Sequence, residues 1–197
     1  MDDIVRQAMA KWPAVPSVYG WLALDRRGRW RIKGEPVGHP LVAEFIGRNY
    51  EPDARGRWFF QNGPQRVFVT LDYTPLVYRY SGGTLRTHTG RAADALTGAW
   101  VDEAGQLVLA TRHGPGVLHD RDLEALVPEF TGADGAPLAE EDLAAALERL
   151  TAGTGASLAL RYRGALVAVR PVRAADVPAR FQFVPAPQPD TAEEACT

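Results

Sequence analysis

Cysteine is almost absent from this sequence. Cys196 is the only one among 197 residues, so the chain can form neither an internal disulfide nor a cysteine-based metal cage. No run approaches the ~20 consecutive apolar residues that span a bilayer. The opening MDDIVRQAMAKWP begins with two acidic residues and lacks the apolar stretch of a secretory signal. We therefore expect a cytoplasmic protein with no membrane partner.

Lysine is scarce as well. Lys11 and Lys33 are the only lysines, so nearly all of the 22 basic residues are arginines, whose planar guanidinium groups suit carboxylates and phosphates. Codon bias in a GC-rich genome explains the same composition. The net charge is −2, but residues 1–100 are net positive and residues 101–197 are net negative. The overall acidity argues against nonspecific binding to DNA.

Recognisable catalytic motifs are also missing. The sequence contains no P-loop, no G-x-G-x-x-G after a strand, no H-E-x-x-H and no G-x-S-x-G elbow. These absences remove the common enzyme families that a single sequence can reveal, although they do not exclude an enzyme. We predict neither a cofactor nor a bound metal.

The composition that remains is that of a folded domain. Hydrophobic residues make up 46% of the chain and charged residues 23%, which excludes disorder for most of it. Apolar alternation interrupted by turn signals predicts neighbouring hairpins, and no regular β-α-β order appears. The prediction is an α+β fold of mainly antiparallel β-hairpins, forming one or two sheets with three or four short helices. The clearest helix is expected over residues 139–150, with Leu143 and Leu147 buried.

The domain organisation is less sharply defined. We expect residues 1–184 to form a single globular α+β region. The segment 81–83, Ser-Gly-Gly, is the candidate boundary between two subdomains, and it is equally consistent with a permissive loop inside one domain. An edge strand is expected over residues 181–184. Residues 185–197 contain little apolar material, which predicts a disordered tail.

One short segment is repeated. The pattern D-x-R-G-R-W occurs at residues 25–30 and 53–58, and a related D-x-x-G turn occupies residues 102–105. Aspartate favours the first position of a type I turn, and glycine can adopt the positive φ that follows. We therefore expect tight turns of similar shape. Strict alternation places Trp30 and Ile32 inward and the neighbouring arginines in water. In the alternative interpretation, the arginines pair with phosphates and the two tryptophans stack on bases.

Polar residues gather around the segment Gly114-Pro115-Gly116. Arg112 and His113 precede it, and His119 and Asp122 follow it. Imidazole and carboxylate groups are common zinc ligands, so this region is a candidate for metal binding or acid–base chemistry. The spacing matches no common motif, and a solvated loop followed by a helix cap explains it equally well. Our prediction is that no metal binds there.

A second, smaller candidate lies on a predicted strand. Arg86 and His88 project to the same face by period-two alternation. Together they could hold a small anionic ligand. A surface histidine beside a surface arginine is the simpler interpretation.

Long stretches of the chain resemble a known family. The segments MAKWPAVPSVYGWLALDRRGRW, IGRNYEPDARGRWFFQNGPQRVFVTLDYTPLVYR and VPARFQFVPAPQP are similar to a proteobacterial family catalogued as a domain of unknown function. The resemblance extends from Lys11 to about Pro189. It implies a bacterial cytoplasmic protein, and it supplies no activity, cofactor or catalytic residue.

Three functional hypotheses remain open. The leading one is a non-catalytic binding or interaction module, with another protein or a second copy of the chain as its partner. The first alternative is a small-ligand-binding protein or an enzyme that uses the histidine-containing region 112–122. The second alternative is nucleic-acid binding through the basic N-terminal half, against which the acidic net charge argues.

Overall fold

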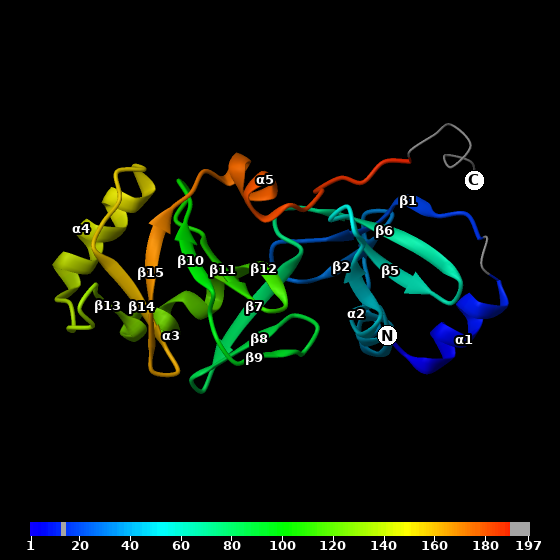
Figure 1. The fold of residues 1–197 in the computed structure, drawn as a ribbon, viewed down its shortest axis with the longest axis horizontal. Helices are drawn as coiled ribbons and strands as arrows, with labels where there is room; N and C mark the ends of the chain where they lie inside the picture. The colour runs from blue at the N-terminus through cyan, green and yellow to red at the C-terminus, as the bar shows by residue number, and fades with distance from the viewer. Residues whose placement is uncertain (13–14, 190–197) are drawn as a thin grey trace. The chain divides into compact units, whose positions relative to one another are not determined.

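The computed structural model describes residues 1–12 and 15–189, which form two compact units (Figure 1). The first unit comprises Met1–Pro75 together with residues 181–189, and the second unit comprises Leu76–Arg180. Each is built on one mixed sheet, with six strands in the first unit and nine in the second. The α+β prediction is confirmed, although the described residues form five short α-helices where we expected three or four.

The sheet of the first unit has the strand order β3-β2-β1-β6-β5-β4. Its neighbours pair antiparallel except for β1 and β6, which run parallel and are connected through β2–β5 and α2. Helix α2 packs against β5. The elements of this unit are α1 (Asp3–Lys11), β1 (Val18–Leu24), β2 (Trp30–Ile32), β3 (Glu35–Pro36), α2 (Pro40–Arg48), β4 (Tyr50–Pro52), β5 (Trp58–Asn62) and β6 (Gln65–Leu71).

The repeated aspartate turns have the same geometry, as the sequence predicts. Asp25 Oδ1 and Asp53 Oδ1 each accept backbone N–H groups two and four residues later, all at 2.9 Å. Their glycines have φ of 78° at Gly28 and 75° at Gly56. The turn that begins at Asp102 repeats the pattern, with Oδ1 accepting at 2.9 and 2.8 Å and a glycine φ of 76°. Each aspartate thus satisfies the backbone donors of its own turn.

The two repeated tryptophans are core residues of the first unit. Trp30 and Trp58 are each 4% exposed, and the Tyr50 ring lies 4.9 Å from the first and 4.8 Å from the second. The buried Tyr50 hydroxyl donates to Pro75 O at 2.9 Å. These tryptophans are therefore not placed to stack on bases. The prediction for Ile32 is wrong, because its side chain is 43% exposed at the end of β2.

The chain returns to the first unit after residue 180. Phe183 is buried there, and Val184 forms an isolated parallel bridge with Arg57. Val184 N donates to Gly56 O at 3.0 Å, and Leu71 N donates to Pro185 O at 2.8 Å. The expected edge strand over 181–184 is thus reduced to a single bridge. Of the tail predicted to be disordered, residues 190–197 lie outside the described residues.

The sheet of the second unit has the order β13-β14-β15-β10-β11-β12-β7-β8-β9. Its parallel pairs are β10 with β15 and β7 with β12. The candidate boundary 81–83 lies at the turn between β7 and β8. The elements are β7 (Leu76–Ser81), β8 (Thr84–Thr87), β9 (Ala92–Ala93), β10 (Gly98–Val101), β11 (Leu107–Thr111), β12 (Gly114–Leu118), η1 (Asp120–Asp122), α3 (Leu123–Leu126), η2 (Val127–Glu129), β13 (Phe130–Gly132), α4 (Glu140–Thr151), β14 (Leu158–Tyr162), β15 (Ala165–Pro171), η3 (Ala174–Asp176) and α5 (Val177–Phe181).

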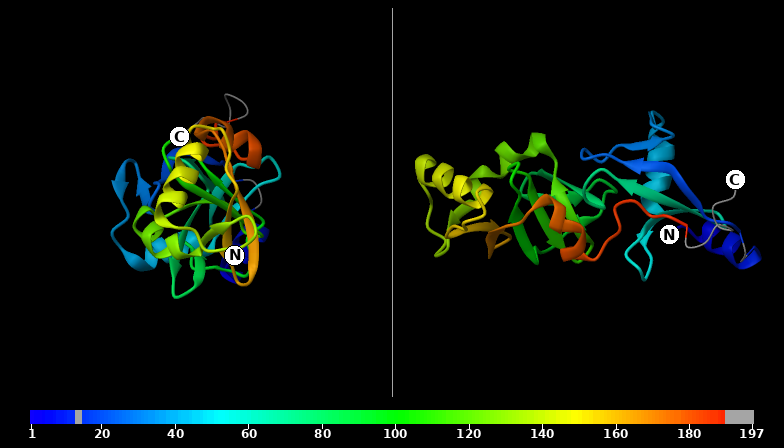
Figure 2. Two further views of the ribbon diagram at one scale, coloured as in Figure 1. Left: turned by 90° about the vertical axis from the view of Figure 1, so that its left-hand side faces the viewer. Right: turned by 90° about the horizontal axis from the view of Figure 1, so that it is seen from above.

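Helix α4 packs on β10 and β15 of this sheet (Figure 2). The predicted helix is confirmed, but the prediction of its buried residues is wrong. Leu143 and Leu147 are half-buried, whereas Ala146 and Leu150 are 4% and 1% exposed. The last two are four residues apart and define the face that meets the sheet.

Candidate functional site

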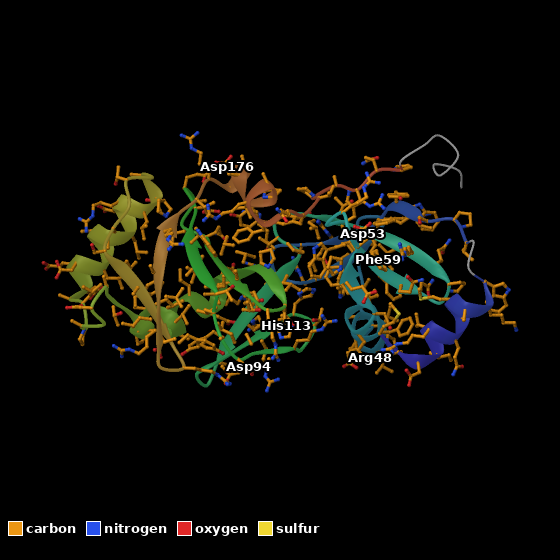
Figure 3. The ribbon with its side chains drawn as sticks, in the orientation of Figure 1. Arg48, Asp53, Phe59, Asp94, His113 and Asp176 are labelled. Carbon is orange, nitrogen blue, oxygen red and sulfur yellow. The ribbon has the colours of Figure 1, made fainter. Side chains whose placement is uncertain are left out.

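The predicted residues Arg112 and His113 hold a neighbouring segment of the second unit. Arg112 Nη2 lies 2.8 Å from Asp94 Oδ2, and the Nε2–H of His113 donates to Ala92 O at 2.8 Å. Figure 3 shows His113 and Asp94 within this unit. Both side chains therefore attach the β9 region to the loop before β12, which is a structural role.

His119 and Asp122 lie at the other end of β12. His119 is buried, and its Nδ1 accepts the Arg121 backbone N–H at 3.2 Å at the start of η1. Asp122 accepts Arg79 Nε at 2.6 Å, Arg79 Nη2 at 3.1 Å and Tyr80 N at 2.9 Å. Burial raises the pKa of Asp122, but the hydrogen bonds from Arg79 and Tyr80 outweigh it, so the pKa is below the ordinary value.

The remaining predicted pair, Arg86 and His88, also has local partners. Arg86 is exposed and its Nη1 donates to Gly90 O at 3.4 Å. His88 Nδ1 accepts the Val77 backbone N–H at 3.2 Å. The imidazole thus bonds to the neighbouring strand β7, and the arginine bonds to the turn that follows its own strand.

The structure does not gather the predicted residues into one site. His113 and His119 are separated by the whole of β12, and a strand rises about 3.3 Å per residue. Among the described residues, no group of three or more His, Cys, Asp or Glu side chains is placed to hold a metal ion. The region 112–122 is instead a strand with a polar anchor at each end.

A different feature of the first unit has the form of a binding site. The pairing of β1 with β6 shifts register between Val18 and Leu22, so β1 is bulged at Gly20, whose φ is 72°. A β-bulge changes the direction of a side chain relative to a regular strand. The residue after this glycine is Trp21, and its side chain is 46% exposed. The bulge thus presents a tryptophan that neither sheet face buries fully.

Trp21 lies on the edge of an apolar hollow of about 300 Å³, which we call the apolar groove. Its floor is formed by the buried side chains of Leu22, Ile46 and Phe60. Trp21 and Ile32 form its exposed rim, and the remaining lining residues are Val18, Asn62, Gln65 and Val67. The groove therefore lies between β1, β2, β5, β6 and helix α2.

The apolar surface continues beyond the groove along α2. Val42 lies one helical turn before Ile46 on the same side of the helix and is 42% exposed. Leu41 beside it is 67% exposed. Large apolar side chains are rarely grouped on the surface of a protein that has nothing to bind there.

A cation lies beside Trp21 at the rim of the groove. Lys33 Nζ lies 3.8 Å from the centre of the Trp21 ring, a cation–π contact, and Lys33 N donates to Trp21 O at 2.7 Å. Lys33 and Gly34 have φ of 50° and 89°, as in the type I′ turn of a two-residue hairpin. Within the described part of the chain, Lys33 has no acidic side chain as a salt-bridge partner.

The sequence contained only a weak signal for this groove. Alternation alone places Ile32 in the core with Trp30. The glycine before Trp21 inside a predicted strand is a bulge signal, and it was the one indication available. Whether another element covers Ile32 depends on the tertiary structure, which the sequence of β2 does not specify.

The chain matches one family model and is similar to two solved structures. The chain belongs to the DUF2944 family, described as "Protein of unknown function (DUF2946)", whose model matches residues 1–188. A crystal structure of a DUF1285 family protein from Silicibacter pomeroyi DSS-3 is similar, with a TM-score of 0.53, 16% identity and coverage of 87% of this chain and 97% of that one. A second DUF1285 family protein, from Shewanella baltica OS155, has a TM-score of 0.42 and 16% identity over 59% of this chain and 94% of that one.

The first of these structures shows a shared fold, and the resemblance to a family of unknown function is confirmed. No curated protein matches the chain. None of the helices in the described residues is long and apolar enough to cross a membrane.

Proposed function

We propose that the first unit is a non-catalytic binding module whose apolar groove receives a segment of a protein partner. The observation that carries this proposal is the exposed pair Trp21 and Ile32 at the rim of a hollow with a fully apolar floor. Tryptophan is among the residue types that most often dominate binding energy at protein interfaces. None of the lining side chains described for this groove titrates, so it offers apolar contacts and amide hydrogen bonds rather than acid–base chemistry.

The extent of the surface favours a protein over a small molecule. A hollow of about 300 Å³ is at the lower limit of ordinary ligand pockets. A ligand filling it would leave Leu41 and much of Val42 in water, since both belong to α2 outside the hollow. A peptide segment with several apolar anchors would cover the groove and α2 together.

The positive charge of Lys33 at the rim indicates which charged residue the partner segment should carry. Lys33 is held over Trp21 and has no acidic salt-bridge partner in the described chain. A carboxylate on the partner would pair with Lys33 at the edge of the apolar contact. The expected segment therefore has two or more apolar anchors followed by an acidic residue.

Selection of random displayed peptides on the immobilised full chain tests this proposal. We expect enriched peptides with apolar anchors and an adjacent Asp or Glu. A synthetic copy should bind the Trp21→Ala protein at least about tenfold more weakly. The Trp12→Ala protein is the matched control, because Trp12 is an exposed tryptophan of the same unit outside the groove.

Lys33 supplies a second comparison. Lys33→Glu should weaken binding of the acidic peptide, and Lys33→Arg should preserve it, because only the first reverses the charge. Selection without a consensus, or a peptide that binds the Trp21→Ala protein as well as the wild type, would refute the proposal.

We further propose a cytoplasmic location for this module. The composition supports it, because a single cysteine cannot form an internal disulfide and such chains are typical of reducing compartments. Fractionation of cells that express the tagged full chain tests this. Recovery of the protein outside the cytoplasmic fraction would contradict it.

A further inference from the structure

We propose that the second unit carries a separate binding site for a small molecule that combines an anionic group with an apolar body. The site is a cavity of about 660 Å³ between the C-terminal end of α4 and the segment that follows β15. This volume lies within the range of ordinary small-molecule sites, about 300–1,000 Å³. The proposal is independent of the apolar groove, because every lining residue belongs to the second unit.

Two arginines make the cavity suitable for an anion. Arg173 and Arg180 both line it, and in the described part of the chain neither has an acidic side chain within salt-bridge distance. The Arg180 guanidinium lies 5.0 Å from the centre of the Trp100 ring. Stacking on an aromatic ring orients a guanidinium without neutralising it. A carboxylate or a phosphate is the group that such a planar donor binds in bidentate fashion.

The two acidic residues that line the cavity differ in their hydrogen bonding. Glu103 Oε2 accepts the Ala174 backbone N–H at 2.9 Å, so part of its hydrogen-bonding capacity is already used. Asp176 lines the same cavity on η3, where Figure 3 shows it (upper part of the picture). Its negative charge opposes an incoming anion. Removing that charge should therefore strengthen binding of the anion.

Part of the remaining lining is apolar and is carried by α4 and by the end of β15. Leu150 from α4, Pro171 at the end of β15 and Val172 just after it form this apolar part, and Thr151, Ala152 and Gly153 complete the lining. Pro171 is paired with Val101 in the sheet, and Val172 N donates to Val101 O at 3.0 Å. Residues carried by a strand are placed more precisely than residues on a free loop. The cavity thus offers a fixed apolar wall beside the arginines, which suits an organic anion better than an inorganic one.

Titration calorimetry on the full chain tests this with four defined probes. Phenyl phosphate and phenylacetate combine an anion with an apolar ring, inorganic phosphate lacks the ring, and benzyl alcohol lacks the charge. We expect at least one of the two organic anions to bind more tightly than inorganic phosphate and benzyl alcohol. Equal binding of the neutral probe, or no binding of either organic anion at millimolar concentration, would overturn the proposal.

Variants assign the binding to this cavity. Arg173→Ala and Arg180→Ala should each weaken binding by roughly tenfold or more, as expected for the loss of a charged hydrogen bond. Asp176→Asn should strengthen it. Arg149→Ala is the matched control, because Arg149 is an exposed arginine of α4 that does not line the cavity.

A control for folding is needed at Arg180, because its side chain contacts Trp100. Among the residues that the structure describes, no aromatic ring contacts Arg173. Arg173→Ala therefore still tests the proposal if Arg180→Ala lowers the thermal midpoint. Unchanged affinity in the Arg173→Ala protein, or weaker binding in the Asp176→Asn protein, would place the anion elsewhere.

Discussion

Replacement of Gly56 by alanine perturbs the contact between the second aspartate turn and the returning chain. Gly56 has a φ of 75°, and an added Cβ would overlap Gln182 O and lie 3.1 Å from Phe183 Cα. Gly105 occupies the equivalent place in the third turn with a φ of 76°, but nothing lies within 4 Å of its added Cβ. The two alanine substitutions therefore share the backbone cost and differ only in the clash.

The shared cost is that of a left-handed alanine, roughly 1–2 kcal/mol. We expect Gly105→Ala to lower the free energy of unfolding by about this amount. At Gly56 the backbone of residues 182–183 must also move. That movement exposes Phe183, which is only 5% exposed, and the loss of such a buried side chain costs about a further 1.5–3 kcal/mol. The expected total for Gly56→Ala is therefore about 2.5–5 kcal/mol.

Urea unfolding of the full chain, followed by tryptophan fluorescence and circular dichroism, measures both substitutions. A double-mutant cycle with Phe183→Ala then identifies the cause. If the clash acts by displacing Phe183, the combined variant should be clearly more stable than additivity predicts. Equal effects of Gly56→Ala and Gly105→Ala within about 0.5 kcal/mol, or strict additivity with Phe183→Ala, would refute the reasoning.

Three further predictions concern stability. Leu150→Ala should cost about 2–5 kcal/mol and the half-buried Leu147→Ala clearly less, as measured by thermal unfolding; equal losses would contradict the assigned helix face. The pKa of Asp122 is lower in the folded state than in the unfolded state, so its stabilisation is complete above the ordinary pKa of about 3.9 and is lost as the pH falls through the folded value. Asp122→Asn should reduce this loss of stability at acid pH, as measured by unfolding at a series of pH values. An unchanged dependence of stability on pH would contradict the role assigned to Asp122. Trp58→Ala should cost about 3–5 kcal/mol and Trp21→Ala less than about 1 kcal/mol in urea, whereas equal costs would contradict their different burial.

The parts of the fold that the sequence predicts correctly are those decided within a few residues. Each aspartate turn closes through bonds from one side chain to backbone groups two and four residues later. The positive φ of the following glycine is a property of that residue type. Helix α4 is likewise recognisable because acidic residues at its start and Arg149 near its end complement the helix dipole.

The candidate sites depend on contacts that no local pattern contains. Trp21 is exposed because β1 is bulged against β6, a strand that pairs with it only after the intervening strands have been placed. Ile32 alternates correctly with Trp30, yet nothing in the described structure buries it fully. The exposed surface of an apolar residue is set by what packs over it, and alternation specifies only the face on which it lies.

The histidine-containing region shows the same division between sequence and structure. The sequence by itself determined that Arg112, His113, His119 and Asp122 flank a short segment rich in glycine and proline. Only the tertiary structure decided that this segment is strand β12, which holds the two histidines at opposite ends, and that Asp122 pairs with Arg79. A strand forms there because β7 and β11 offer their backbone groups on both sides. Those partners come from elsewhere in the chain, and hydrogen bonding to them overrides the preference of glycine and proline for a loop.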